Sequence, residues 1–181
     1  MSQFEEKQIE REEIYDGAVL HVVKDKILLP DGNTSFREFC LHKGAVAVIP
    51  ITENNEAILV RQFRYAHHRE FLEIPAGKFE FIGEEPLVAA KRELEEETGA
   101  SAAKYTYLGV LDTTPALIDE KIHLYMAEEL TYGEMHLDED EFLSVERIPL
   151  TKLIDMVMSG EIRDGKTQIA ILKAARILGI N

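Results

Sequence analysis

A helix is predicted at residues 86–98, because Pro86 stands in its first turn and Gly99 lies just past its end. Strands are predicted before and after it, so the helix is embedded in a sheet-forming chain. The most apolar of these segments, residues 45–52, has the composition of a strand that is buried on both faces. Strands on both sides of one embedded helix predict a mixed α/β or α+β sandwich.

The remaining elements follow from apolar runs and the turn residues between them. A turn at residues 30–33 separates the first two strands, since Pro, Asp, Gly and Asn tolerate the backbone angles of a tight turn. Two helices are predicted to close the chain, at residues 150–158 and 166–178, and the second has one apolar face at helical spacing. The other predicted strands are residues 19–29, 35–42, 57–64, 71–75, 105–112, 121–129 and 143–148.

The composition excludes several classes of protein. The chain has 34 acidic and 20 basic residues, a formal net charge of −14, whereas nucleic-acid binding needs a clustered basic face. The single cysteine, Cys40, cannot form an internal disulfide and fits a reducing compartment. Residues 1–15 lack the apolar core of a signal peptide, and no run approaches the ~18 apolar residues of a membrane span. We therefore expect a cytoplasmic, soluble protein with no nucleic-acid or membrane partner.

The predicted helix carries an acidic face. At about 100° per residue, Glu93, Glu96 and Glu97 share one arc, while Glu95 points elsewhere. Carboxylates on one arc repel one another, and partial burial makes the repulsion worse. Arg92 is placed to pair with Glu96 at i+4, and a hard divalent cation such as magnesium would neutralise the rest. The alternative is an acidic helix face that is simply solvated.

The segment 77–100 resembles the signature of the Nudix hydrolase family. That signature is glycine, five residues, glutamate, seven residues, Arg-Glu, an aliphatic residue, any residue, Glu-Glu, any residue, glycine and an aliphatic residue. In one departure, six residues rather than five separate Gly77 from Glu84, which we interpret as a one-residue bulge at Phe81-Ile82 before the helix begins. The residues that match in order are Glu84, Arg92, Glu93, Leu94, Glu96, Glu97, Gly99 and Ala100.

The resemblance implies a fold and a set of roles. The fold would be an α/β/α sandwich with a mixed central sheet, in which a loop–helix–loop holds the metal ions. Arg92 would orient the carboxylates, and Glu84 would support the junction of loop and helix. Glu96 would act as a ligand or anchor a metal-bound water. The implied metal ligands are the Ala76 carbonyl and the carboxylates of Glu93, Glu96 and Glu97.

Within the family, residues from about 15 to about 175 resemble the ADP-ribose pyrophosphatase subfamily. Pro115 lies fifteen residues beyond the last signature position, as in ADP-ribose hydrolases, and would help to bind the substrate. Ala116 follows it where relatives often have glycine, and Pro115 taken alone could be an ordinary turn proline. Arg64 would contact the substrate phosphates through its forked donors, with Glu73 also in the substrate-binding set. The alternative for Arg64 is a surface salt bridge.

The N-terminal strands have a separate role in this resemblance. Residues 1–42 would be an antiparallel strand region for dimerisation and substrate recognition, and residues 43–181 the Nudix domain. In relatives these strands are exchanged across a homodimer, so that an arginine at the position of Arg37 reaches the partner's site.

A second acidic cluster occupies residues 137–142. By register with ADP-ribose hydrolases, Glu139 would be the general base and Glu141 an additional metal ligand, and a mobile loop would bring the base in after the substrate. The alternative is a solvated acidic loop. The pair His67-His68 could suggest a metal site, but it follows a strand end and has no partners at metal-ligand spacing, so we do not expect a metal there. Candidates for stacking on adenine are Tyr15, Phe39 and Tyr65, although core packing would also explain them.

These expectations together describe a magnesium-dependent hydrolase, with Mn²⁺ able to replace Mg²⁺, that converts ADP-ribose to AMP and ribose 5-phosphate. One alternative is a hydrolase of another nucleoside diphosphate sugar, such as GDP-mannose. Another is a non-catalytic ADP-ribose sensor, although such domains usually lose helix carboxylates that are all present here. A nucleoside-triphosphate hydrolase is a further alternative, but those chains tend to lack the N-terminal strand region.

Overall fold

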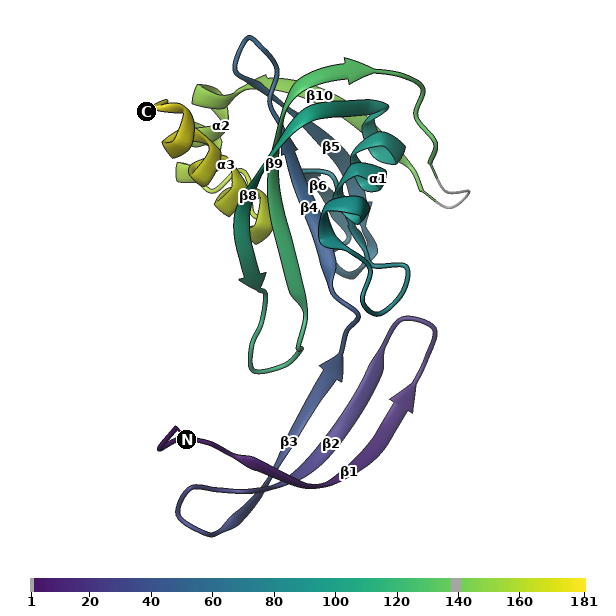
Figure 1. Ribbon diagram of the computed structural model, residues 1–181, viewed down its shortest axis with the longest axis vertical. Helices are drawn as coiled ribbons and strands as arrows, with labels where there is room; N and C mark the ends of the chain where they lie inside the picture. The colour runs from purple at the N-terminus through teal and green to yellow at the C-terminus, as the bar shows by residue number, and fades with distance from the viewer. Residues whose placement is uncertain (1, 138–140) are drawn as a thin grey trace. The chain divides into compact units, whose positions relative to one another are not determined.

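The computed structural model describes residues 2–137 and 141–181. The chain divides into two compact units (Figure 1). One comprises the residues up to Lys43 together with Asp112–Lys121, and the other comprises Gly44–Leu111 and Ile122–Asn181. Within the described ranges, none of the helices combines the length and the apolarity that a membrane crossing requires.

The first unit is an antiparallel sheet of three strands, β1 (Lys7–Asp16), β2 (His21–Leu28) and β3 (Thr34–Leu41), in that order. Its buried side chains centre on Asp25, which accepts two hydrogen bonds of 2.7 Å from the guanidinium of Arg11. Every residue of β1 is exposed. The backbone N–H of Cys40 donates to the Leu117 carbonyl at 2.8 Å, which ties the end of β3 to the segment 112–121.

The second unit contains two sheets. The larger is mixed and has the order β7-β4-β9-β8, with β4 antiparallel to β7 and parallel to β9. The smaller is antiparallel and has the order β10-β5-β6. The strands are β4 (Ala45–Pro50), β5 (Glu56–Arg64), β6 (Arg69–Glu73), β7 (Ala76–Lys78), β8 (Ala100–Asp112), β9 (Lys121–Tyr132) and β10 (Leu143–Pro149).

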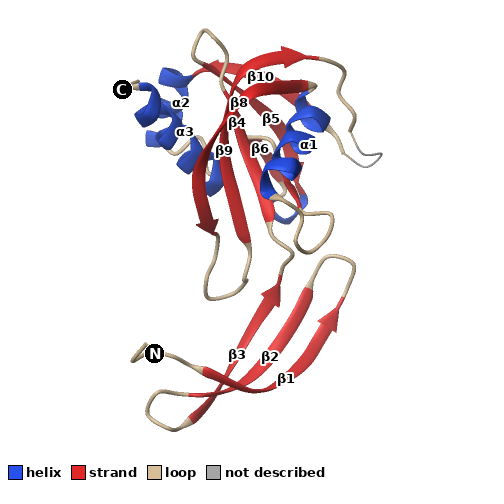
Figure 2. Cartoon of the chain, viewed as in Figure 1, coloured by secondary structure: helices blue, strands red, loops and turns tan. Residues whose placement is uncertain are grey.

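Helices cover both faces of the mixed sheet, as the cartoon of Figure 2 shows. On one face, Val46 and Val48 of β4 pack with Leu94 of α1 (Pro86–Thr98). On the other face, the alternate residues Ala47 and Ile49 belong to the core that includes α2 (Leu150–Met158) and α3 (Gly165–Leu178). Burial of β4 on both sides explains its apolar sequence, and the layers confirm the predicted sandwich.

The predicted helices and most predicted strands are present, although β8 begins at Ala100 rather than at residue 105 and β6 spans Arg69–Glu73 rather than residues 71–75. The helix predicted at residues 86–98 is α1, and it ends at Gly99, which adopts the left-handed conformation with φ 65°. The sequence did not distinguish β1 as a strand, because its residues are charged and show no buried face. It also missed β7, which has three residues, and the short 3-10 turn η1 (Tyr65–His67) after β5.

Candidate active site

The site begins where β7 meets α1. β7 pairs with β4, with Ala76 opposite Ala47, so the sheet fixes its backbone before the loop that leads to α1. A Cβ atom at Gly77 would lie 2.0 Å from Cδ of Glu93. Only a glycine therefore allows the Glu93 carboxyl group to lie against this strand. The additional residue at 81–82 comes later in the loop and leaves this approach intact.

One turn further along α1, Glu97 lies beside the same strand. The backbone N–H of Ala76 donates to Oε2 of Glu97 at 3.3 Å. Glu93 and Glu97 are 8% and 5% exposed, whereas Glu95 is exposed and Glu96 is intermediate. The predicted acidic arc is thus present, and two of its three carboxyl groups are buried.

Burial changes the titration of this pair. It raises the pKa of Glu93 to about 7, against the lowering effect of Arg92 beside it. Burial and the charge of Glu93 together raise the pKa of Glu97 to about 8. Ionising both groups in this setting is unfavourable unless a positive charge lies between them. Two buried carboxyl groups against a strand backbone therefore have the donor chemistry that suits a hard divalent cation.

Arg92 is the cation that the chain itself supplies. Its Nη1 donates to Oε1 of Glu93 at 2.7 Å and to Oε2 of Glu96 at 3.0 Å. The predicted i+4 pair with Glu96 is confirmed. Nη2 donates to the carbonyl of Lys78 at 3.3 Å, so the guanidinium also joins α1 to the strand that carries Gly77.

Glu84 lies in the loop ahead of α1 and is 7% exposed. Its Oε2 accepts the backbone N–H of Glu80 at 2.7 Å, and Oε1 lies 3.7 Å from Nη2 of Arg92. These contacts close the loop across its bulge, where Phe81 and Ile82 are 59% and 85% exposed. A role for Glu84 in supporting the junction of loop and helix agrees with this geometry.

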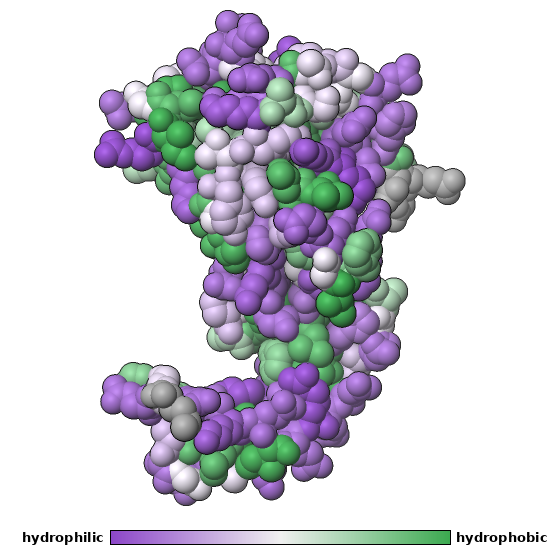
Figure 3. Space-filling view, viewed as in Figure 1, coloured by the Kyte–Doolittle hydropathy of each residue, from purple (hydrophilic) through white to green (hydrophobic). Residues whose placement is uncertain are grey.

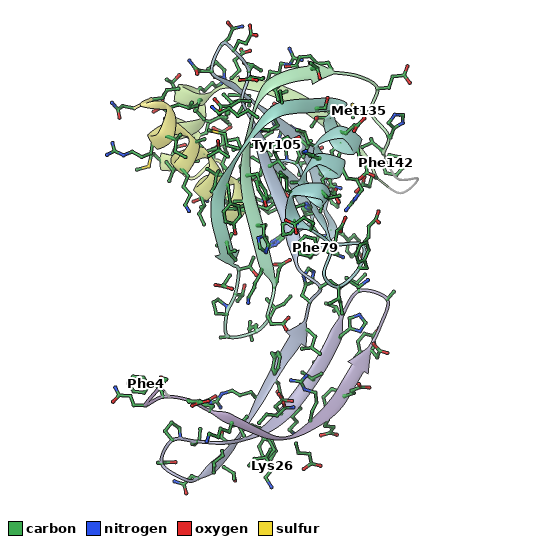
Figure 4. All side chains as sticks on the ribbon, in the orientation of Figure 1. Phe4, Lys26, Phe79, Tyr105, Met135 and Phe142 are labelled. Carbon is green, nitrogen blue, oxygen red and sulfur yellow. The ribbon has the colours of Figure 1, made fainter. Side chains whose placement is uncertain are left out.

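The loop between β9 and β10 is attached to the C-terminal end of α1. The backbone N–H of Gly133 donates to the Gly99 carbonyl at 2.6 Å, and that of His136 donates to the Glu96 carbonyl at 3.0 Å. Figure 4 shows Met135 and Phe142, on the two sides of residues 138–140, close to α1. The charge of Glu141 contributes to the raised pKa of both Glu93 and Glu97, after the larger effect of burial. The predicted base, Glu139, lies outside the described residues.

A second polar cluster surrounds Glu73 at the end of β6. Arg64, at the end of β5, donates from Nε and Nη2 to the two carboxylate oxygens of Glu73 at 2.9 and 2.7 Å. Lys166 donates to Oε2 of the same carboxylate at 2.6 Å. Although burial opposes the charged form, these donors lower the pKa of Glu73 to about 2. The Arg64 side chain is 42% exposed, so its outer edge can reach a ligand.

Two of the predicted substrate-binding residues belong to the first unit. Arg37 lies on β3, where its guanidinium pairs with Glu6 of the N-terminal segment. Pro115 lies in a turn that is closed by a hydrogen bond of 2.8 Å from the Leu117 N–H to the Thr114 carbonyl. Their contacts with substrate stay predictions.

The remaining candidates occupy other positions. Tyr65 and Tyr15 are 79% and 59% exposed, so core packing does not account for them, while Phe39 lies 5.5 Å beneath the guanidinium of Arg11. His67 packs against Phe71 at the end of η1. Among residues 2–137 and 141–181, no three His, Cys, Asp or Glu side chains are grouped so as to hold a metal ion. The structure therefore does not bring the predicted ligands Glu93, Glu96 and Glu97 together as a group of three, and Glu96 pairs with Arg92 instead.

Two residues of the site were not found from the sequence. Lys166 and Thr167 begin α3, and both contact the residues around Glu73 across 93 positions of chain. No spacing rule relates segments so far apart. The only local signal was the N-cap residue Asp164, whose carboxylate accepts the Thr167 N–H at 2.9 Å and marks the helix start.

Comparison with known proteins agrees with this geometry. The model of the family described as "NUDIX domain" matches residues 41–167. The ADP-ribose pyrophosphatase of Bacillus subtilis (strain 168) is 44% identical over 94% of this chain and 93% of its own length. A methanol dehydrogenase activator from Bacillus methanolicus is 44% identical over 93% of this chain and 91% of its own. The crystal structure of an ADP compounds hydrolase superposes with a TM-score of 0.86 at 23% identity, covering 99% of this chain and 97% of that one.

The fold has a mixed sheet between helices. Its site has a glycine-bearing strand beside two buried glutamates, and the family model matches most of the chain. The chain belongs to the NUDIX family. Within it, two relatives match nearly the full length at 44% identity, and they are named ADP-ribose pyrophosphatase and methanol dehydrogenase activator.

Proposed function

We propose that this chain hydrolyses the pyrophosphate bond of ADP-ribose to give AMP and ribose 5-phosphate. The observation that carries the proposal is the buried pair Glu93 and Glu97 beside Ala76, with the exposed edge of Arg64 in the same unit. A diphosphate needs positive charge on both phosphates, and the site supplies a place for a cation and a forked donor. The similar ADP-ribose pyrophosphatase makes ADP-ribose the first substrate to test.

The cofactor is proposed to be Mg²⁺, with Mn²⁺ able to replace it. When bound, the ion offsets phosphate charge and makes a water acidic enough to attack. The Ala76 carbonyl, Glu93 and Glu97 would hold it, with Glu96 and Glu141 completing the set. Retention of all these carboxylates argues against the alternative of a sensor that binds ADP-ribose without hydrolysis.

Each remaining group has one task in the proposed reaction. Arg64 binds the phosphates, while Glu73 holds its guanidinium plane. Arg92 orients Glu93 and Glu96. Glu139 accepts the proton of the water that attacks one phosphorus, and the bond from that phosphorus to the bridging oxygen breaks.

We also propose a homodimer in which the N-terminal strands are exchanged. Support comes from the three-stranded sheet, whose exposed apolar side chains Ile9, Ile14 and Phe36 occur among charged ones. Figure 3 shows apolar surface beside polar surface on this unit. In the dimer Arg37 would leave Glu6 and contact the substrate of the partner, and Pro115 would also bind substrate. A cytoplasmic location, which fits the single free cysteine Cys40, belongs to this proposal as well.

A substrate panel tests the proposal. ADP-ribose, GDP-mannose, ADP-glucose, NADH, dinucleoside polyphosphates and nucleoside triphosphates are each incubated with Mg²⁺, and the products are separated by ion-exchange chromatography. Preferential release of AMP and ribose 5-phosphate from ADP-ribose is expected. Preference for GDP-mannose would favour the alternative sugar-nucleotide hydrolase, and activity limited to nucleoside triphosphates would contradict the assignment.

A further inference from the structure

The N-terminus of α3 contacts the site from the side opposite α1. Asp164 is the N-cap, and its Oδ2 accepts the N–H of Thr167 at 2.9 Å and the Thr167 hydroxyl at 2.5 Å. Oδ2 also lies 3.1 Å from Nζ of Lys166. Thr167 is fully buried, and the Lys166 side chain is 11% exposed. These three residues therefore form a hydrogen-bonded polar cluster at the start of α3.

On one side, this cluster contacts Glu73 through Lys166. Nζ of Lys166 donates to Oε2 of Glu73 at 2.6 Å, the oxygen that also accepts Nη2 of Arg64 at 2.7 Å. The Glu73 side chain is 4% exposed. Of its two partners, Lys166 is 11% exposed and therefore lies toward the protein interior, whereas Arg64 is 42% exposed and lies on the solvent side. With its carboxylate held from within, Glu73 offers Arg64 a fixed plane for two parallel hydrogen bonds.

On the other side, the cluster contacts the connection between β6 and β7, just before Ala76. The hydroxyl of Thr167 accepts the backbone N–H of Ile74 at 2.9 Å. The same hydroxyl donates to Asp164, so both of its hydrogen-bonding directions are used. Ile74 is 1% exposed and lies two residues before Ala76, whose own N–H donates to Glu97. Thr167 therefore fixes the chain just before it enters the acidic site.

We propose that Lys166 and Thr167 are positioning residues for the hydrolase. Lys166 acts through Glu73 on the direction of the Arg64 guanidinium, and Thr167 acts through Ile74 on the backbone at Ala76. Neither touches the substrate. The inference rests on the proposed function for the roles of Arg64 and Ala76, and it assigns the two residues different effects, one on substrate affinity and one on metal affinity.

The Lys166 half is tested with Lys166→Met, which keeps the length of the side chain and removes the ammonium, and with Lys166→Arg as the conservative control. Loss of a hydrogen bond to a charged group typically changes an equilibrium constant about 10–100-fold. We expect Lys166→Met to raise KM by that factor for whichever nucleoside diphosphate sugar the parent hydrolyses. Its affinity for Mn²⁺ without substrate should not fall, because Lys166 contacts Glu73 and Asp164, and neither belongs to the proposed ligand set. Lys166→Arg should recover most of the KM.

An unchanged KM in Lys166→Met would overturn this half of the proposal. A rise in KM that is matched by an equal weakening of Mn²⁺ binding would also overturn it, since the two together would indicate general damage to the fold. Far-UV circular dichroism and thermal unfolding of each variant confirm that folded proteins are compared. Lys166→Met leaves the cap between Asp164 and Thr167 in place, so it is the variant that keeps the test decisive if a Thr167 change does not fold.

The Thr167 half is tested with Thr167→Val, which has the same shape without a hydroxyl, against Thr167→Ser, which keeps it. Mn²⁺ binding is followed by electron paramagnetic resonance in the absence of substrate. We expect Thr167→Val to weaken Mn²⁺ binding, about 10-fold or more as for other supporting contacts, and Thr167→Ser to remain near the parent. Equal Mn²⁺ affinity in the parent and Thr167→Val would refute it. This measurement needs no substrate, so it stays informative even if the panel shows that the proposed reaction is wrong.

Discussion

Glu97→Gln is the substitution whose effects follow most directly from the burial of the acidic pair. Gln keeps the shape of the side chain and an oxygen that can accept the Ala76 N–H. It removes a carboxyl group whose pKa the fold raises from 4.5 to about 8, first by burial and then by the charge of Glu93. A group with a raised acidic pKa binds a proton more tightly in the folded than in the unfolded chain.

In metal-free protein, folding stability is highest below pH 4.5 and falls as the pH rises toward 8, because only the unfolded chain releases the proton of Glu97 in that window. At pH 7 the loss amounts to about 2.5 pH units, or ~3 kcal/mol, relative to a side chain that cannot ionise. We therefore expect Glu97→Gln to be more stable than the parent by about 3 kcal/mol at pH 7 in the presence of EDTA. At pH 5 the difference should shrink below about 1 kcal/mol.

The assay is urea unfolding in EDTA at pH 5, 7 and 9, followed by ADP-ribose hydrolysis with Mg²⁺. The variant should lose turnover by orders of magnitude although its fold is more stable, because it lacks a metal ligand. Glu95→Gln is the matched control, since Glu95 is exposed on the same helix and should change neither property. A Glu97→Gln protein that is less stable than the parent at pH 7, or that keeps the parental rate, would refute the reasoning.

Three further predictions follow from the same site. Mn²⁺ affinity should rise between pH 6 and 8, because the ion displaces protons from Glu93 and Glu97. Calorimetry in two buffers measures the proton release. An affinity that is flat over this range would contradict the raised pKa values. Gly99→Ala should lower the free energy of unfolding by about 1–2 kcal/mol in urea titrations, since the residue is left-handed. Its new Cβ would also lie 2.8 Å from the Gly133 carbonyl oxygen, so activity should fall as the loop is displaced, and full activity would exclude that coupling. Arg64→Lys should raise KM more than it changes kcat, because a point charge replaces a fork held by Glu73; equal KM values would exclude phosphate binding by Arg64.

The sequence predicted the parts of the fold that have local signals. Pro86 and Gly99 mark the two ends of α1, and the apolar run at 45–52 marks the central strand β4. The strand β1 has no such signal, because every residue in it is exposed and the charges of its sequence do not alternate with apolar positions. The strand β7 has only three residues and is defined by its pairing with β4, which no local sequence pattern reveals.

The site divides in the same way. The arc of Glu93, Glu96 and Glu97 follows from helical geometry alone, since positions i, i+3 and i+4 at 100° per residue fall within about 100° of one another. The depth of burial, and hence the raised pKa of two of these groups, depends on the strand beneath α1. The contact of Lys166 with Glu73 joins segments 93 residues apart, which is a property of the packed sheet and helices.

The central claim is that the buried Glu93 and Glu97 tolerate each other because a divalent cation lies between them and binds a diphosphate. Anomalous diffraction from crystals grown with Mn²⁺ and a methylene analogue of ADP-ribose tests it directly. We predict a manganese peak bounded by these two carboxylates and the Ala76 carbonyl, with phosphate oxygens on its open side. Carboxylates that point into solvent in such crystals, with no manganese near them and the analogue bound elsewhere, would contradict the claim.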